Sequence, residues 1–352
     1  MKIALVGMAN SGKTTLFNAL TGQHLPTSTY PTPLQGARLQ HGQASVPDER
    51  LPGLAQLLRP KKTTPAKVHF VDFIGLRPGQ AQENLQVLQF IKGADALVQV
   101  VRAFREPSVP GAVEPLQELQ SLQLELILTD LELLEKRLER LQEARKKGKR
   151  PSEAELQALL KCKGHLEEGR PLRELRLSPE EEQALRHLEL ITFIPALVLF
   201  NVSEEALSSK ETEAFVQAVP HSLALSAKLE AELSELEPPE QEAFLRELGL
   251  KEPASQRLIR AAYGLLGLIT FFTYASQELR AWSIRAGATA LQAAGKIHTD
   301  MARGFIRAEV INAEELLRAG GLKEARSQGL LRLEGKDYVV QDGDVLTIRF
   351  KV

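Results

Sequence analysis

The sequence predicts an α/β fold: a parallel sheet interrupted by a helical hairpin and followed by a small α+β domain. Short apolar runs alternate with helical or loop segments up to about residue 115, and leucines then recur at helical spacing up to about residue 168. After about residue 266 the composition shifts to glycine, threonine and short β-type runs. A chain of 352 residues is long for one hydrophobic core, so two or three domains are expected.

The predicted sheet consists of four short, nearly continuous apolar runs. They are Ile3–Val6, Val68–Val71, Ala96–Val101 and Ala196–Phe200. Runs of this kind are typical of strands buried on both faces, as in a parallel sheet that carries helices on either side.

A leucine repeat predicts a coiled coil. The leucines, at steps of four and three, are Leu124, Leu128, Leu131, Leu134, Leu138 and Leu141. The basic segment Arg145–Pro151 interrupts the pattern, and Leu156, Leu159, Leu160 and Leu166 resume it, which indicates an antiparallel hairpin. The basic tip is either a solvated turn or a contact to a phosphate backbone.

These patterns give the predicted domain boundaries. Residues 1–117 and 190–266 form the α/β domain, residues 118–189 the inserted coiled coil, and residues 267–352 the C-terminal domain.

Bulk composition indicates a cytoplasmic protein. The single cysteine, Cys162, excludes an intramolecular disulfide and fits a reducing compartment. The apolar N-terminus is too short for a signal peptide, and no run approaches the roughly 18 apolar residues of a membrane span. The net charge of −1 does not point to nucleic acid, although a local basic face remains compatible with it.

The segment from Gly7 to Thr14 (GMANSGKT) matches the phosphate-loop pattern G-x-x-x-x-G-K-[ST]. It follows a predicted strand and opens a predicted helix. Glycines let backbone N–H groups face a phosphate, and the helix N-terminus adds a favourable field. The nucleotide-binding residues expected here are Gly7, Asn10, Ser11, Gly12, Lys13, Thr14 and Thr15.

A D-x-x-G sequence ends the second predicted strand. Asp72 is placed to hold Mg²⁺ together with the Thr14 hydroxyl, and the Gly75 N–H to sense a γ-phosphate.

The base-reading loop departs from the guanine pattern N-K-x-D. The strand Ala196–Phe200 leads into Asn201-Val202-Ser203-Glu204, in which the lysine is missing and the acid is one methylene longer. Ser226-Ala227-Lys228 has the form of a loop that caps the base through its backbone. Such backbone contacts are compatible with either ATP or GTP.

Together these features resemble the Obg-like ATPase (YchF) family, of which the sequence looks like a divergent member. The resemblance covers nearly the whole chain. Besides the phosphate loop, the segments similar to the family are Val46–Leu51, Glu125–Leu131, Ser226–Leu233, Arg280–Trp282, Ala294–Asp300, Gly304–Glu309 and Gln341–Asp344. The resemblance implies a P-loop GTPase-like domain, an inserted coiled coil and a C-terminal TGS domain. It also implies ATP rather than GTP as ligand, since the family carries N-x-x-E, and it allows a K⁺ ion at Asn10.

Three departures from the family concern hydrolysis. Leu34 replaces a threonine of the first switch, with Thr32 out of register, and the second switch after Gly75 is shortened and poor in glycine. Ser108 stands where the family has its proposed catalytic histidine, so the catalytic group is unassigned. Leu76 cannot orient water as a glutamine would, and hydrolysis on the order of 10⁻⁴ s⁻¹ or slower is expected without a partner.

The leading functional hypothesis is therefore a nucleotide-gated regulatory protein with slow ATPase activity. The alternatives are a nucleotide-binding scaffold without hydrolysis and a conventional GTP-binding GTPase. By resemblance, the partner is the ribosome or RNA, reached through the coiled coil and the TGS domain. A monomer that neither enters a membrane nor reads DNA sequence is expected.

Overall fold

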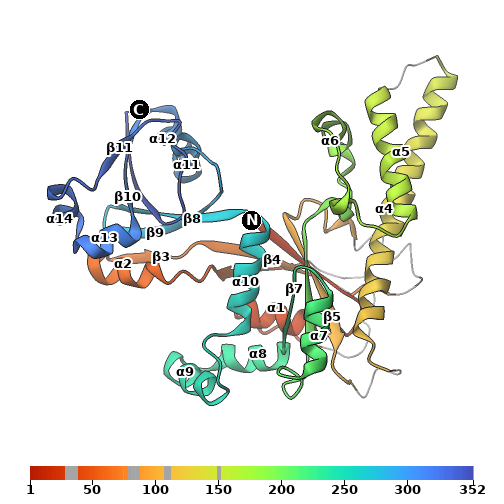
Figure 1. Ribbon diagram of the computed structural model, residues 1–352, viewed down its shortest axis with the longest axis horizontal. Coiled ribbons are helices and arrows are strands. Elements are labelled where there is room, and N and C mark those ends of the chain that lie inside the picture. The colour runs from red at the N-terminus through yellow and green to blue at the C-terminus, as the bar shows by residue number, and fades with distance from the viewer. Residues whose placement is uncertain are drawn as a thin grey trace. The chain divides into compact units, whose positions relative to one another are not determined.

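The computed structural model describes residues 1–27, 39–73, 75–77, 79, 84, 88–106, 112–148 and 152–351. The chain divides into two compact units, one of residues 1–42 and 69–255 and the other of residues 43–68 and 256–352. The colours of Figure 1 follow the chain through both. Residues 43–68 thus group with the C-terminal part of the chain. The three-part division with boundaries at 117, 189 and 266 stays a prediction.

The first sheet has the strand order β2-β4-β1-β5-β6-β7. Its strands are β1 (Lys2–Val6), β2 (Gln40–Ser45), β4 (Lys67–Asp72), β5 (Ala96–Ala103), β6 (Ala196–Val202) and β7 (Ser222–Leu225). β1 pairs in parallel with β4 and β5, and β5, β6 and β7 continue the parallel arrangement. This confirms the predicted α/β fold. The carboxyl ends of these parallel strands meet at one edge, which is where ligands bind in such sheets.

Side chains of β1 alternate between two covered faces of the sheet. Ala4 and Val6 pack in a core cluster with Leu122 and Leu126 of helix α4 (Pro115–Lys146). Ile3 and Leu5 point the other way and are equally buried. The other helices of this unit whose bounds fall within the described residues are α1 (Lys13–Thr21), α5 (Glu153–Glu167), α6 (Pro179–Leu185), α7 (Lys210–Ala218), α8 (Ala227–Glu235) and α9 (Pro238–Glu247). Short 3₁₀ turns are η1 (Leu172–Glu174), η2 (Arg186–Leu188) and η3 (Ile191–Phe193).

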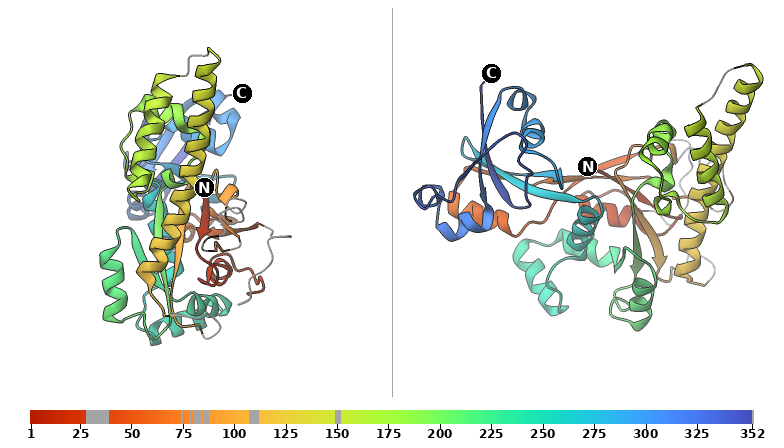
Figure 2. Two further views of the ribbon diagram at one scale, coloured as in Figure 1. Left: turned by 90° about the vertical axis from the view of Figure 1, so that its right-hand side faces the viewer. Right: turned by 45° about the horizontal axis from the view of Figure 1, so that its top comes forward.

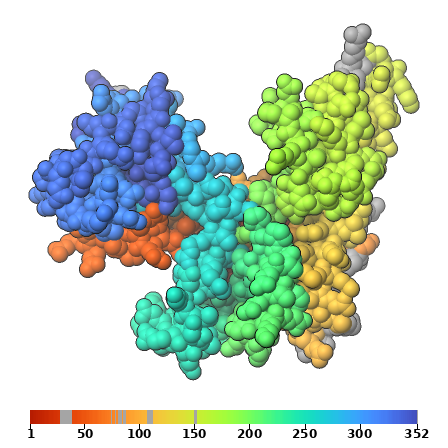
Figure 3. All heavy atoms as spheres, in the orientation of Figure 1, coloured from red at the N-terminus to blue at the C-terminus, as the bar shows by residue number. Residues whose placement is uncertain are grey.

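Helix α4 runs for 32 residues, from beside the sheet into a helical arm where it lies next to α5 (Figures 1 and 2). The arm core contains the expected leucines of its outer half, joined by residues of α5: Leu134, Leu138, Leu141, Leu159, Cys162 and Leu166. The space-filling view shows α5 and α6 as one continuous surface (Figure 3). The buried Cys162 thiol has its pKa raised to about 12, chiefly by burial, so it is not a reactive thiolate.

The predicted seam is wrong at Leu124, Leu128 and Leu160, which are 52%, 50% and 49% exposed. For Leu124 and Leu128 the reason is that the first half of α4 packs against the sheet rather than against α5, whereas Leu160 of α5 lies outside the arm core. Its buried stripe is therefore Leu119, Leu122 and Leu126, a different face of the helix from the one that the heptad pattern favours. Leu131 and Leu156 pack at the margin of the arm core.

The second unit contains a sheet with the strand order β11-β10-β12-β8-β9-β3. Its strands are β3 (Lys62–Thr64), β8 (Leu268–Ala275), β9 (Glu278–Arg285), β10 (Phe305–Asn312), β11 (Arg332–Glu334) and β12 (Asp344–Phe350). Its helices are α2 (Arg50–Leu58), α11 (Ala290–Ile297), α12 (Thr299–Arg303), α13 (Ala313–Ala319) and α14 (Leu322–Ser327), and α10 (Ala254–Leu265) crosses the unit boundary. Phe271, Val310 and Leu346 lie in its core, where Trp282 packs beside Phe271.

Residues 43–68 are built into this second unit. β3 pairs in parallel with β9, and Arg50 donates hydrogen bonds to both Asp48 and Asp342, each at 2.7 Å at its shortest. The guanidinium also lies 5.4 Å from the centre of the Phe272 ring. Two of the segments that carry the family resemblance, Val46–Leu51 and Gln341–Asp344, therefore meet in this structure.

None of the helices in the described ranges is both long and apolar enough to cross a membrane.

Candidate phosphate-binding site

The phosphate loop has the backbone geometry that its glycines predict. It connects β1 to α1, and Gly12 has φ 88°, a left-handed conformation that side chains other than glycine adopt at a cost. A Cβ atom at Gly7 would lie 2.4 Å from the Val100 carbonyl oxygen. Asn10 also has a positive φ, 62°, and is partly exposed on the loop. Both glycines are thus required by the loop itself.

Lys13 lies almost completely buried beneath this loop, with 5% of its surface exposed. Its Nζ donates a hydrogen bond of 2.8 Å to the Met8 carbonyl oxygen. Burial lowers the pKa of Lys13 to about 8, against the opposing attraction of Asp72 and Glu118. The ammonium group is held in place by the loop and its charge is only partly compensated, as suits a group that binds phosphate.

Thr14 and Asp72 form a second contact, in which the Thr14 hydroxyl donates to Asp72 Oδ2 at 2.8 Å. Asp72 is 3% exposed, and burial raises its pKa. Its other oxygen, Oδ1, is buried and has no hydrogen-bond partner among the described residues. A hydrated Mg²⁺ would satisfy such an oxygen, so these two residues fit the predicted metal site.

The described part of the chain contains no group of three His, Cys, Asp or Glu side chains that could hold a metal ion. A Mg²⁺ ion at Thr14 and Asp72 would therefore take its other ligands from water and phosphate oxygens, the usual arrangement for this ion. When bound, it would neutralise charge on the phosphates.

Leu76 pairs with the phosphate loop through its backbone, and Gly75 lies against the same loop. The Leu76 N–H donates to the Gly7 carbonyl and the Leu76 carbonyl accepts from the Ala9 N–H, both at 3.0 Å. A Cβ atom at Gly75 would lie 2.6 Å from Ala9 and 2.8 Å from Lys13 Nζ. Gly75 therefore has to be glycine, and it lies next to the lysine that would hold the β- and γ-phosphates.

The Leu76 side chain is fully buried among Met8, Leu88 and other core residues. Glutamine is the residue type that usually positions water, but at position 76 it would be buried, so Leu76→Gln should not speed up hydrolysis. Burying the amide without partners should instead lower the free energy of unfolding by about 2–4 kcal/mol. Urea unfolding and single-turnover ATP hydrolysis test this. A stable variant with faster hydrolysis would show that this side chain reaches the nucleotide.

Asn201 connects the phosphate loop to the predicted base-capping loop. Its Nδ2 donates to the Ser11 carbonyl at 3.0 Å, and its Oδ1 accepts from the Ala227 N–H at 2.9 Å. The contact is close, since a Cβ atom at Gly12 would lie 2.1 Å from Asn201 Nδ2. Sequence reasoning placed Asn201 at the base, and this bridging contact was missed.

The other predicted base-loop residues differ in exposure: Ser226 and Ala227 are buried, whereas Glu204 and Lys228 lie at the surface. Ser226 is buried and its hydroxyl caps α8 by accepting from the Leu229 N–H. Glu204 is exposed in the turn after β6, and the Lys228 side chain is 88% exposed and 3.9 Å from Glu232. Thr15 is partly buried in the first turn of α1.

Several predicted positions lie outside the described residues. They are Ser108, which takes the place of the family histidine, and the first-switch residues Thr32 and Leu34. The predictions made for them stay predictions.

One further charged pair lies close to the site. The Arg102 N–H donates to Glu118 Oε1 at 2.9 Å, and the Arg102 Nε lies 3.5 Å from Oε2. Burial raises the pKa of Glu118, and its charge acts on Lys13. An arginine within the apolar strand β5 was the sequence signal that could have indicated this pair.

The lowered pKa of Lys13 predicts a pH dependence. A bound phosphate favours the protonated amine, so its pKa should rise on binding, and binding above pH 8 should then take up a proton. ATP affinity should be constant near pH 7 and fall above about pH 8, by up to about tenfold per pH unit. Calorimetry in two buffers of different ionisation enthalpy measures the proton uptake. An affinity that stays constant to pH 9.5, without proton uptake, would contradict it.

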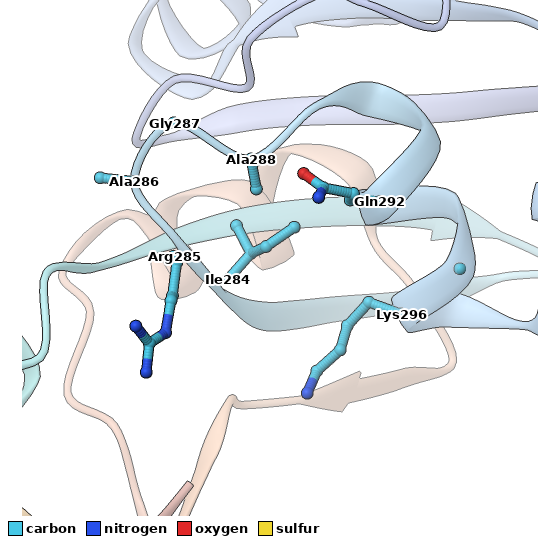
Figure 4. A pocket seen from close by; sticks show the side chains of 8 residues that line it. Ile284, Arg285, Ala286, Gly287, Ala288, Gln292 and Lys296 are labelled. Carbon is cyan, nitrogen blue, oxygen red and sulfur yellow. The ribbon is translucent and has the colours of Figure 1, made fainter. Parts of the chain in front are cut away.

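The second unit carries a separate groove of about 560 Å³ between the end of β9 and α11. Figure 4 shows Arg285 and Lys296 extending from these two elements on the same side. Gly295 and Lys296 belong to the Ala294–Asp300 segment of the family resemblance. This groove contains none of the phosphate-loop residues.

Comparisons with known proteins agree with the geometry. Residues 2–136 match a family model described as "50S ribosome-binding GTPase", and residues 268–351 match YchF-GTPase_C, described as a protein of unknown function (DUF933). The "Ribosome-binding ATPase YchF" proteins of Bacillus subtilis (strain 168) and Escherichia coli O157:H7 are each 40% identical over 362 aligned positions. They cover 99% and 100% of this chain, which covers 98% and 99% of theirs.

A solved structure, "Structure of the Schizosaccharomyces pombe YchF GTPase", matches with a TM-score of 0.82 at 29% identity. The match covers 99% of this chain and 97% of the solved one. Full-length identity of this order, both family models and the fold lead to one assignment. The chain belongs to the YchF (Obg-like ATPase) family of P-loop GTPase-like proteins.

Proposed function

We propose that this protein is a Mg²⁺-dependent nucleotide-binding regulator that prefers ATP to GTP, hydrolyses it slowly and associates with the ribosome. The observation that supports it most is the contact between the two loops. Asn201 holds the Ser11 carbonyl of the phosphate loop and the Ala227 N–H of the base-capping loop in one hydrogen-bonded unit. A ligand with both phosphates and a base would contact both loops at once.

The preference for ATP rests on the loop after β6. Guanine recognition requires a short carboxylate that pairs with two N–H groups of the base, and Glu204 stands at that position with a longer, exposed side chain. The asparagine of the same loop is already committed to protein contacts. Discrimination in favour of guanine is therefore weak. ATP is the proposed ligand, and GTP is the alternative that the test must exclude.

Slow hydrolysis follows from what surrounds Gly75. The phosphate loop has all the residues expected to bind the phosphates, including Lys13. Leu76, in contrast, is buried in the core and cannot orient water. Intrinsic rates without a water-positioning group are on the order of 10⁻⁴ s⁻¹. The same observation favours the second candidate, a nucleotide-bound scaffold that does not hydrolyse at all.

The ribosome is proposed as the partner because the two curated relatives are named ribosome-binding ATPases. The cytoplasm is the compartment that goes with this partner. Co-sedimentation with ribosomes in the presence of ATP, ADP or no nucleotide tests the association. If the same amount of protein sediments with ribosomes in all three conditions, ribosome binding does not depend on the nucleotide.

The base preference is tested by calorimetric titration of ATP and of GTP in the presence of Mg²⁺. We expect micromolar binding of ATP and much weaker binding of GTP. Glu204→Asp shortens the carboxylate, and the ratio of GTP to ATP affinity should rise in this variant. Clear preference for GTP in the wild-type protein would contradict the proposed ligand, and lack of binding by either nucleotide would contradict the proposed function.

A further inference from the structure

Glu125 of helix α4 accepts hydrogen bonds from Gly79 and Asn84, two described residues that follow Gly75 in the chain. Its Oε1 accepts a hydrogen bond from the Gly79 N–H at 3.1 Å, and its Oε2 accepts one from Asn84 Nδ2 at 2.8 Å. Asn84 is 2% exposed, and it also bonds to the Arg77 backbone, donating to the Arg77 carbonyl at 2.8 Å and accepting from the Arg77 N–H at 3.0 Å. One carboxylate thus binds two points of the chain, about four and nine residues after the glycine proposed to sense a γ-phosphate.

This segment is bonded to the phosphate loop at its other end. Leu76 exchanges backbone hydrogen bonds with Gly7 and Ala9, one residue before Arg77. Movement of Gly75 toward or away from a terminal phosphate therefore acts on a short, hydrogen-bonded chain that ends on Glu125. Hydrogen bonds to a charged group are stronger than those between neutral groups, so the two bonds of Glu125 can influence such a movement.

Glu125 lies on the rigid part of a helix that continues into the arm. Leu122 and Leu126 on either side of it are buried against the sheet, and the same helix buries Leu134 and Leu138 in the arm core. Helix α4 is continuous from residue 115 to 146, so a displacement at Glu125 is carried along the helix axis (Figure 1).

A second contact connects the same helix to the base-reading side of the site. Asp130 is 1% exposed and accepts hydrogen bonds from the Ile191 N–H at 3.0 Å and from the Thr192 N–H at 2.7 Å. Ile191 and Thr192 form η3, which leads directly into β6 and so to Asn201. Helix α4 therefore contacts both segments that would respond to a nucleotide.

We propose that Glu125 is a positioning residue. Through its bonds to Gly79 and Asn84 it couples the chain after Gly75 to the helical arm, so that the arm adopts different positions when ATP and when ADP is bound. The inference rests on the proposed function, because it concerns the response of that nucleotide site. Coupling of this kind is reciprocal: whatever binds the arm more tightly in the ATP state raises the affinity for ATP by the same factor.

The test compares Glu125→Ala and Glu125→Gln with a control on the same helix, Glu132→Ala. Glu132 is partly exposed and forms an ion pair with Lys136, one helical turn further along, so the control removes a charge from the same helix without touching Gly79 or Asn84. Calorimetry with ATP and with ADP gives the ratio of the two affinities. Hydrogen exchange with and without nucleotide reports on the phosphate loop and on residues 115–146 separately.

We expect the ratio of ATP to ADP affinity to fall about fivefold or more in Glu125→Ala, with a smaller fall in Glu125→Gln, which keeps one acceptor oxygen. Nucleotide should still protect the phosphate loop, whereas its effect on exchange along α4 should be lost. The control should behave as the wild-type protein does. Thermal unfolding is measured alongside, since a merely structural role would lower stability without changing the affinity ratio.

An unchanged affinity ratio in Glu125→Ala, together with wild-type exchange along α4, would overturn the coupling. An equal loss in Glu132→Ala would overturn the assignment to Glu125. Failure of the proposed function gives a different result, because the wild-type phosphate loop would then show no protection by either nucleotide.

Discussion

Lys13→Ala should weaken Mg²⁺–ATP binding by about 100-fold or more. The buried ammonium is held 2.8 Å from the Met8 carbonyl and lies beside Gly75, where it would neutralise the charge of the terminal phosphates. No other lysine of the described residues is recorded at this loop. Calorimetric titration measures the change, and the exposed Lys251 supplies the control variant Lys251→Ala.

The loss of binding should occur without loss of stability. Burial lowers the pKa of Lys13 to about 8, so the charged amine is less favourable in the folded protein than in the unfolded chain. Lys13→Ala removes this cost at neutral pH, which offsets part of the lost packing. Urea unfolding should therefore show an unfolding free energy near that of the wild-type protein. Binding of ATP within a few-fold of the wild-type affinity would contradict the role of the lysine.

Asn201→Ala should have the second largest effect, on stability and binding together. It leaves the Ser11 carbonyl and the Ala227 N–H without their partner in a buried position, at about 1–3 kcal/mol for each group. The unfolding free energy should fall by about 2–6 kcal/mol. Affinities for ATP and GTP should fall by similar factors, because the two loops lose their common support.

Asn201→Asp separates the two bonds. An aspartate keeps an acceptor for the Ala227 N–H but places its second oxygen against the Ser11 carbonyl, so repulsion replaces that hydrogen bond. The unfolding free energy of Asn201→Asp should therefore fall by more than the loss of the hydrogen bond to the Ser11 carbonyl alone would cause. Selective loss of one nucleotide in Asn201→Ala would instead mean that this residue reads the base, as sequence reasoning first placed it.

The geometry of the phosphate loop was predictable because its requirements are local. Gly7, Gly12 and Lys13 lie in the turn between one strand and one helix, and Asp72 ends the neighbouring strand; their roles toward a nucleotide stay predictions. The link through Asn201 was not predictable in the same way. It joins residues 190 positions apart, and a side chain that reads a base and one that bridges two loops occupy the same sequence pattern.

The arm and the second unit also contain contacts that the sequence pattern could not predict. Heptad spacing gives the right helix but cannot tell whether a leucine faces another helix or a sheet, so Leu124 and Leu128 were placed in the wrong contact. Residues 43–68 lie between two strands of the first sheet in chain order, yet Arg50 bonds to Asp342, 292 positions away. Only the three-dimensional structure brings such distant residues together.

Single-turnover hydrolysis of Mg²⁺–ATP by the purified protein tests the separation of binding from hydrolysis most directly. With all of the ATP bound, we expect phosphate release on the order of 10⁻⁴ s⁻¹ or slower, because the cradle is complete while Leu76 is buried. Undetectable release from a saturated complex would leave the scaffold as the function. Release at about 1 s⁻¹ or faster without a partner would contradict the account, since it would require a water-positioning group near Gly75 that the buried Leu76 does not provide.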